Sequence, residues 1–567
     1  MAVDLILLHA PSVYDFREKT ILCGPVSDQI PSSPVFEMYP IGFTSLAEYL
    51  ERAGYRVRIV NLAVRMLNDS KFNAERMIAS LKAPVFGIDL HWMLHCHGSI
   101  EVAKLVKKHH PGSRVLFGGF SSSYYYRELI KFPQIDYILR GDSTEEPLRQ
   151  LMRSIKSGRE PETVPNLVWR DSRGRMRVNP FSHTPTDLSH VMVRHYANTV
   201  RSVIRYRDLA SYTPFQGWAD YPITAVFTCR GCTQNCTICG GSAAAFRKFY
   251  NRKKPAFRSP EAVNKDIRQI ARFSRGPAFV LGDLRQAGDE YARELFRLLQ
   301  EKKVKNQLIF EIFNPAPREF LRQMSLSSPD FCLEMSPESH DPEVRKAEGR
   351  HFSNEELEQT IGDALDVGCG RFDVFFMIGV PLQTPQSALD TVDYCGYLLD
   401  KFKGDKRLSL FIAPLAPFLD PGSPAFEKPV QYGYHILFRS LEEHRNALVQ
   451  PHWRYSLNYE TDWMSRQQIV DITYQAMTRL NRLKAEYGVI PEQMAQAENH
   501  RLESAREMMQ RIDEIVSQGD YEKLDLLKPH IDEINMSPST HWEELKLPVG
   551  SVRVRFLRSL WSWLTGR

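Results

Sequence analysis

Four of the nine cysteines in this 567-residue chain lie within the segment TCRGCTQNCTICGG, which begins at residue 228. Cys232, Cys236 and Cys239 have the spacing C-x-x-x-C-x-x-C. Thiolates at this spacing on one loop can converge on one face of an iron-sulfur cluster, and the glycines of the segment would let backbone amides reach the sulfurs. The alternative is a tetrahedral structural zinc that also uses Cys229. The packing of all four cysteines into one loop favours the cluster.

The composition is that of a globular protein with several domains. Hydrophobic residues make up 43% and charged residues 25% of the chain, and the net charge of +5 does not by itself predict nucleic-acid binding. An odd number of cysteines, unevenly spread, suits a metal or redox site better than a disulfide framework. The start, MAVDLILLHAPSVYDF, fits neither a secretory signal nor a spanning helix, so we expect a cytoplasmic protein.

Residues 1–165 alternate short apolar runs such as VDLILLHAP, YRVRIVNL, VFGIDLH and SRVLFGGF with helical stretches. This alternation predicts an α/β fold with a doubly wound parallel sheet of the flavodoxin-like type. Ligands of such sheets bind beyond the carboxyl ends of the strands. Gly118 and Gly119 follow one predicted strand, where a backbone without side chains can approach a ligand closely.

The rest of the chain divides into four parts. Residues 166–220 predict a hairpin and an irregular linker, and residues 221–425 contain six strand-helix repeats that predict a partial or complete α/β barrel. Functional residues of such barrels sit at the carboxyl ends of the strands, and the cysteine segment follows the first strand. Residues 426–550 predict a helical domain. In it, the stretch WRYSLNYETDW is a candidate to face the substrate through Tyr455, Tyr459, Glu460 and Trp463, but aromatic residues at this spacing are more often core.

Residues 551–567 form a basic tail that predicts an amphipathic helix. Its apolar positions fall on one helical face, and arginines lie close by: Leu557, Leu560, Trp561 and Leu564, with Arg553, Arg555, Arg558 and Arg567. Such a helix can lie on an anionic membrane surface. Docking on the protein itself is the alternative, and both interpretations stay open.

The cysteine segment resembles the motif of the radical SAM superfamily. The resemblance implies a 4Fe-4S cluster held by Cys232, Cys236 and Cys239, with S-adenosylmethionine (SAM) bound to the fourth iron through its amino and carboxylate groups. Reductive cleavage of SAM would then give a 5′-deoxyadenosyl radical. Cys229 stands where many members carry Ser or Thr, which implies a packing or supporting role.

Later segments are similar to other parts of the same family. FRSPEAVNKDI resembles a helix start in which Ser259 is the N-cap, and MSPESHDPEVRKAEGR makes Glu338 and Ser339 candidates for SAM contacts. FMIGVPLQT resembles the segment that packs beside SAM at the fifth strand, which adds Gly379 and Pro381.

Two positions depart from the family pattern. Ile238 stands before the third cysteine, where an aromatic residue is usual, so packing against the adenine of SAM is expected to differ. The second-strand segment reads LGDL, which leaves Asp283 as the counterpart of an acidic residue common in the family. Neither departure affects the three cluster cysteines.

The N-terminal part resembles the cobalamin-binding half of cobalamin-dependent radical SAM proteins, through YPIGFTSLAEYLERAGYRVRIVNL, LFGGF and IDYILRGDSTEEPLRQL. The likeness implies that Gly118 and Gly119 lie at a cobalamin site. The motif D-x-H-x-x-G, which supplies a histidine to cobalt, is absent after the first strand. We interpret His91 in DLHWML as a structural or solvent-facing histidine, and the lower axial ligand stays unassigned.

The pairing of the two halves implies a cobalamin-dependent radical SAM enzyme that methylates, or otherwise forms a C-C bond at, an unactivated carbon. No residue is assigned as a catalytic acid or base. The basic tail and the aromatic helical domain point to a lipid or isoprenoid substrate, with peripheral contact to the inner face of the membrane. A soluble natural product or a peptide is the alternative. An electron donor such as ferredoxin or flavodoxin is the expected protein partner.

The sequence also suggests two other function classes. The basic and aromatic segment 246–258 could bind tRNA. However, only Cys23 and Cys96 precede the motif and the chain ends in helices, whereas the tRNA-modifying members carry extra cysteines and a terminal β-barrel. Nucleic acid is therefore not favoured as a partner. A cobalamin or redox sensor is the non-enzymatic alternative, and it would leave Glu338, Gly379 and Pro381 without a role.

Overall fold

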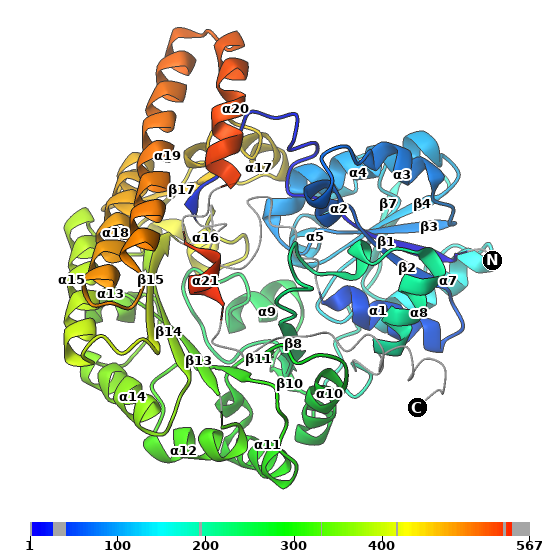
Figure 1. Cartoon of the computed structure of the whole chain (residues 1–567). Coiled ribbons are helices and arrows are strands. Elements are labelled where there is room, and N and C mark those ends of the chain that lie inside the picture. The colour runs from blue at the N-terminus through cyan, green and yellow to red at the C-terminus, as the bar shows by residue number, and fades with distance from the viewer. Residues whose placement is uncertain are drawn as a thin grey trace.

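The computed structural model describes residues 3–25, 41–191, 196–329, 331–414, 418–536 and 540–546. Two α/β halves lie side by side, the first in blue and cyan and the second in green to yellow, and long helices flank the second half (Figure 1). The predicted tail 551–567 lies outside the described residues.

The N-terminal sheet has the strand order β2-β1-β3-β4-β5-β6-β7. Its first five strands are parallel: β1 (Leu5–His9), β2 (Val57–Asn61), β3 (Val85–Asp89), β4 (Arg114–Gly118) and β5 (Tyr137–Leu139). Separate hydrophobic cores cover its two faces, one beneath α1 (Gly42–Arg52) and α7 (Glu145–Lys156), the other beneath α3 (Ala74–Ser80) and α4 (Cys96–His109). This is the predicted doubly wound sheet, with its switch point between β1 and β3.

The hairpin predicted after residue 165 belongs to the N-terminal sheet. Strands β6 (Leu167–Arg170) and β7 (Met176–Val178) pair antiparallel, and β6 pairs antiparallel with β5. Gly174 closes the turn at a φ of 74°, and its amide donates to the carbonyl of Asp171. The hairpin thereby extends the first sheet before the chain crosses to the second half through α8 (Tyr196–Tyr206).

The second half is an open barrel of six parallel strands in chain order, with β8 and β15 at the two edges. The strands are β8 (Thr224–Phe227), β11 (Ala278–Leu281), β12 (Leu308–Glu311), β13 (Cys332–Glu338), β14 (Arg371–Ile378) and β15 (Leu408–Pro414). The intervening helices include α10 (Pro260–Phe273), α11 (Asp289–Glu301), α12 (Arg318–Ser327), α14 (Asn354–Asp366) and α15 (Pro385–Lys401). As predicted, the Ser259 side chain caps α10 by accepting from the amide of Ala262.

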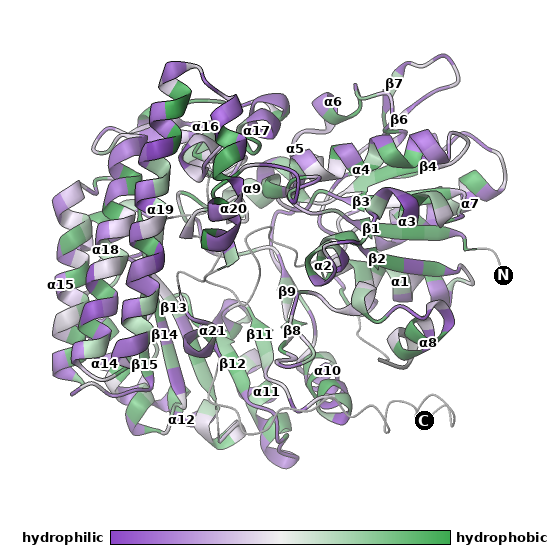
Figure 2. Ribbon diagram, turned by 45° about the horizontal axis from the view of Figure 1, so that its top comes forward, coloured by the Kyte–Doolittle hydropathy of each residue, from purple (hydrophilic) through white to green (hydrophobic). Residues whose placement is uncertain are grey.

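The C-terminal helices share the barrel's hydrophobic core. Helices α18 (Arg466–Glu486) and α19 (Glu492–Gln518) bury residues such as Leu480 and Leu502 in one cluster with the outer face of the barrel strands. Helix α20 (Glu522–Met536) follows α19, and the short α21 (Trp542–Leu545) lies in front of the barrel (Figure 1). The strands are largely hydrophobic and the outer helices carry hydrophilic residues (Figure 2). In the described ranges, no helix is both long and apolar enough to cross a membrane.

Candidate functional site

The cysteine loop, residues 229–241, leaves the carboxyl end of β8. It begins with the short strand β9 (Cys229–Arg230), which pairs antiparallel with β10 (Ala256–Phe257). Gly231 then adopts a φ of 95°, and a Cβ there would lie 2.7 Å from Cδ of Arg252. Only glycine fits both the left-handed conformation and this close contact. The loop therefore turns sharply just before the three cysteines.

The three predicted ligands are free thiols on this loop. Cys232 and Cys236 are half-buried and Cys239 is exposed. The amide of Gln234 donates to Sγ of Cys232 and the amide of Gly241 to Sγ of Cys239, both at 3.3 Å. Burial raises the pKa of Cys232 to about 11, and the neighbouring Cys236 and Cys229 add to the rise.

This donor set fits an iron-sulfur cluster, because sulfurs that already receive backbone hydrogen bonds are tuned to carry thiolate charge. Bound iron would reverse the cost of ionising thiols that lie close together. Within the described part of the chain, no group of three or more His, Cys, Asp or Glu side chains is arranged to hold a single metal ion.

A buried polar group that we call the Glu338 cluster lies beside the cysteine loop and comprises Glu338, Glu348, Arg350 and Tyr459. Residues 347–349 pack on the loop: the amide of Thr237 donates to the carbonyl of Glu348 at 3.3 Å. Within the cluster, Nη2 of Arg350 lies 3.2 Å from Oε1 of Glu338.

The Glu338 cluster contains polar atoms that no described residue satisfies. These are Oε2 of Glu338, Nε of Arg350 and the Tyr459 hydroxyl. The Glu348 carboxyl group has the backbone of Ile238, in the cysteine loop, as its hydrogen-bond neighbour. Burial raises the pKa of Glu338, against the opposing charge of Arg350, and it raises the pKa of Glu348 well above its usual value. Buried polar groups in folded proteins are nearly always hydrogen-bonded, so such a cluster indicates a polar ligand. The amino and carboxylate groups of SAM would supply suitable partners.

The structure brings Gly379 to the same place. Gly379 has a φ of 88°, and a Cβ there would lie 2.5 Å from the Tyr459 hydroxyl. Pro381 follows it and is buried. Of the aromatic residues in this stretch, Trp453 and Tyr459 belong to the core, and Tyr455 and Trp463 are half-buried. Tyr459 also links Gly379 to the Glu338 cluster.

Ser339 and Asp283 have their side chains occupied by local contacts. Ser339 is fully buried, and its hydroxyl accepts from the amide of Asp341 at 3.1 Å. The Asp283 carboxylate binds the guanidinium of Arg285 and accepts from the amide of Phe313 at 2.9 Å. These two residues hold the ends of β13 and β11 in place, which is a supporting role.

Histidines gather around one carboxylate at the switch point of the N-terminal sheet. Asp89 ends β3, and Nδ1 of His9 and Nδ1 of His91 lie 3.1 and 2.7 Å from its carboxylate oxygens. The ring of His95 lies 4.9 Å from that of His9. Burial acts to raise the pKa of Asp89, but the two imidazoles outweigh it and hold that pKa below its usual range.

The predicted cobalamin-side glycines lie against this histidine group. Gly119 has a φ of 115°, and a Cβ there would lie 2.5 Å from Cα of His91. Gly118 has nothing within 4 Å of its ideal Cβ position, so the backbone at the end of β4 is open to close approach. The sequence singled out His91 but missed His9 and His95, because nothing local links the end of the first strand to the third.

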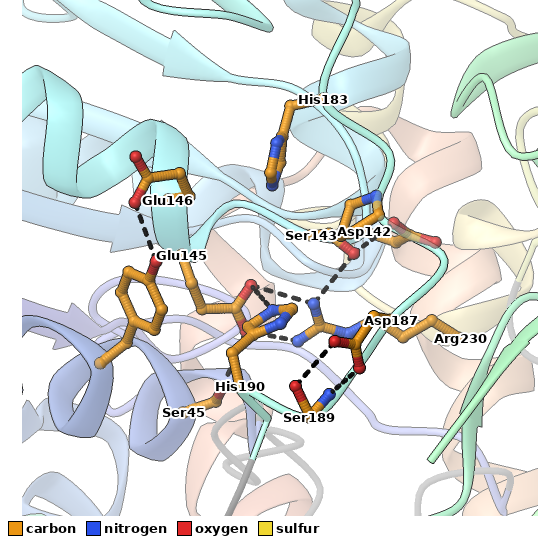
Figure 3. A network of polar contacts seen from close by, with 12 residues as sticks. Ser45, Asp142, Ser143, Glu145, Glu146, His183, Asp187, Ser189, His190 and Arg230 are labelled. Atoms are coloured by element: carbon orange, nitrogen blue, oxygen red, sulfur yellow. Dashed lines mark hydrogen bonds and ion pairs between the residues drawn. The ribbon is translucent and has the colours of Figure 1, made fainter. Parts of the chain in front are cut away.

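The cysteine loop is linked to the carboxyl edge of the N-terminal sheet directly at its start and through Asp420 near its other end. Arg230 at the start of the loop binds Glu145, the first residue of α7 after β5 (Figure 3). Near the other end, the Gly240 amide donates to Asp420 at 3.1 Å, and Asp420 accepts from the Trp92 indole at 3.2 Å. Trp92 follows β3. The cysteine loop therefore faces the sheet edge that carries the histidine group.

Two family models match the chain. The B12 binding domain matches residues 32–149 and the radical SAM superfamily matches residues 226–395. The chain is therefore a radical SAM protein with an N-terminal B12-binding domain.

Comparisons with known proteins agree with this assignment. Hopanoid C-3 methylase of Methylococcus capsulatus is 22% identical over 293 residues, 51% of this chain and 51% of that protein. The chain thus matches about half the length of the curated relatives.

Two solved structures share the fold over most of the chain. The radical SAM methyltransferase TsrM from Kitasatospora setae, with cobalamin and a [4Fe-4S] cluster bound, has a TM-score of 0.58 and 14% identity, covering 90% of this chain and 100% of that one. The radical enzyme OxsB, with aqua-cobalamin and SAM bound, has a TM-score of 0.55 and 13% identity, covering 99% and 84%.

Proposed function

We propose that the chain is a cobalamin-dependent radical SAM enzyme that methylates, or otherwise forms a C-C bond at, an unactivated carbon. The observation that carries the proposal is the link of the cysteine loop to the carboxyl edge of the N-terminal sheet, directly through Arg230 and, near the other end, through Asp420. Ligands of doubly wound sheets and of α/β barrels bind at these edges, so the two sites face one another. When bound, SAM and the cluster would supply a deoxyadenosyl radical and cobalamin a methyl group.

Each site has its own candidate residues. Cys232, Cys236 and Cys239 would hold the cluster, and the Glu338 cluster with Gly379 and Pro381 would bind and orient SAM. Gly118 and Gly119 would let cobalamin approach the sheet edge. Asp283 and Ser339 would keep the strand ends in position. The packing of the two halves against one another would exclude water from the space between them.

The proposed substrate is a lipid or an isoprenoid chain. A relative named as a hopanoid methylase and the basic apolar tail at 551–567 support this choice. Deleting residues 551–567 should abolish cosedimentation with vesicles that contain anionic lipid, while leaving behaviour with neutral vesicles unchanged. Equal binding of both proteins to anionic vesicles would remove the tail from the argument and favour a soluble natural product or peptide.

The function is tested by anaerobic reconstitution with iron, sulfide and hydroxocobalamin, followed by reduction and addition of SAM. We expect a cluster absorption band, retained corrinoid and formation of 5′-deoxyadenosine, with flavodoxin or ferredoxin able to replace dithionite. Cys236→Ala should abolish the cluster band and deoxyadenosine formation. Cys395→Ala is the matched control, because Cys395 is a fully buried cysteine of α15.

The possible results separate the alternatives. Corrinoid and cluster without SAM cleavage would favour a sensor. SAM cleavage without corrinoid retention would remove methyl transfer as the function.

A further inference from the structure

Two arginines, one at the start of the cysteine loop and one after the helix that follows it, reach across to one turn of the N-terminal half. The guanidinium of Arg230 contacts both carboxylate oxygens of Glu145, one at 2.9 Å, and donates to the Ser143 hydroxyl at 3.0 Å. The guanidinium of Arg252, beyond helix α9 (Ala243–Phe249), binds Asp142 through two nitrogens. We call Asp142, Ser143, Glu145, Arg230 and Arg252 the interdomain ion network.

The network is buried and its charges are matched. The side chains of Glu145 and Arg230 are 2% and 16% exposed, and those of Asp142 and Arg252 are 4% and 1% exposed. Glu145 also accepts from the Ser45 hydroxyl at 2.8 Å, and Nε2 of His190 lies 3.7 Å from it. Two-point contacts of arginine with carboxylate fix direction as well as distance.

The network contacts the cysteine loop directly before the first predicted cluster ligand. Arg230 stands two residues before Cys232, and the aliphatic part of Arg252 packs on Gly231 between them. The acidic partners follow β5, whose carboxyl end belongs to the edge where a doubly wound sheet binds its ligand. A displacement of this turn therefore moves the start of the cysteine loop with it.

We propose that Glu145 and Arg230, supported by Asp142 and Arg252, are positioning residues that set the separation between the cobalamin site and the iron-sulfur cluster. This inference rests on the proposed function, because it presumes that both cofactors bind. It adds a defined mechanical link between two sites that are held by different halves of the chain.

The separation is measured by the dipolar coupling between cob(II)alamin and the reduced cluster in reconstituted holoenzyme, using pulsed electron paramagnetic resonance. Glu145→Gln keeps the shape of the side chain and removes its charge. Arg230→Lys keeps the charge and loses the two-point contact. It is the milder of the two variants and serves as the test if Glu145→Gln does not retain the cluster. Glu146→Gln is the matched control, because Glu146 points away from Arg230 and binds Tyr49 and Arg149 within its own half (Figure 3).

We expect a shifted and broadened distance distribution in Glu145→Gln and Arg230→Lys, and the wild-type distribution in Glu146→Gln. Both network variants, when loaded with the cluster but not with corrinoid, should still form 5′-deoxyadenosine. A variant that had lost its overall structure would not. Wild-type distances in both network variants would overturn this inference alone. A wild-type protein that fails to bind either cofactor would overturn the proposed function as well.

Discussion

Two buried groups of charges, the interdomain ion network and the Glu338 cluster, contact the cysteine loop, and they differ in how fully their hydrogen-bonding groups are satisfied. In the interdomain ion network, each carboxylate meets a guanidinium or a hydroxyl. In the Glu338 cluster, Oε2 of Glu338 and the Tyr459 hydroxyl have no hydrogen-bond partner among the described residues. Burial costs a polar group free energy unless hydrogen bonds replace those with water. A satisfied group is thus suited to holding structure, and an unsatisfied one to binding a ligand.

Removing one member of the interdomain ion network tests whether this group stabilises the structure. Arg230→Ala leaves Glu145 as a buried charge without its main partner and should lower the free energy of unfolding by about 3–5 kcal/mol. Urea denaturation of the apoprotein measures the loss. Arg149→Ala, which removes a half-exposed ion pair within α7, should cost less than about 1 kcal/mol. Equal losses in the two variants would contradict the assigned holding role.

In the Glu338 cluster, we expect a substitution to stabilise the protein instead of destabilising it. Burial raises the pKa of the fully buried Glu348 carboxyl group well above its usual value, so folding at neutral pH requires that group to bind a proton. Glu348→Gln keeps the shape of the side chain and removes this requirement, and at pH 7 it should raise the free energy of unfolding of the apoprotein by about 1–3 kcal/mol. The same denaturation experiment measures the gain. Destabilisation by more than about 1 kcal/mol would mean that Glu348 has a structural partner, and the contrast between the two groups would fail.

A carboxyl group inside the barrel adds a pH dependence. Burial, then the charges of Asp373 and Glu311, raise the pKa of Glu334 on β13 from 4.5 to about 8. The folded protein thus keeps a proton that the unfolded chain releases, so the stability that Glu334 contributes is lost as pH rises from 4.5 to 8. The slope is at most about 1.4 kcal/mol per pH unit. Glu334→Gln should flatten the decline measured by thermal unfolding, and an unchanged slope would assign it to other groups.

The sequence predicted the features that are determined by residues close together in the chain. The strands of both halves follow from short apolar runs, and the cysteine loop follows from spacing within eleven positions. Partners far apart in the chain were not foreseen: Arg230 binds Glu145 across 85 positions, and His9 meets Asp89 across 80. Hydropathy patterns show which face of a strand is buried but not which charges meet there. The pairing of the hairpin with β5 was missed for the same reason.

We infer that the Glu338 cluster beside the cysteine loop is the SAM site and that the interdomain ion network is not. Titration of SAM into cluster-loaded, reduced protein, followed by the electron paramagnetic resonance signal of the cluster, tests it directly. SAM should change the signal of wild type and of Glu145→Gln at similar concentrations. In Glu338→Gln the affinity should fall roughly 10- to 100-fold, the size expected for losing a hydrogen bond to a charged group. Unchanged SAM affinity in Glu338→Gln, or an equal loss in Glu145→Gln, would contradict the claim.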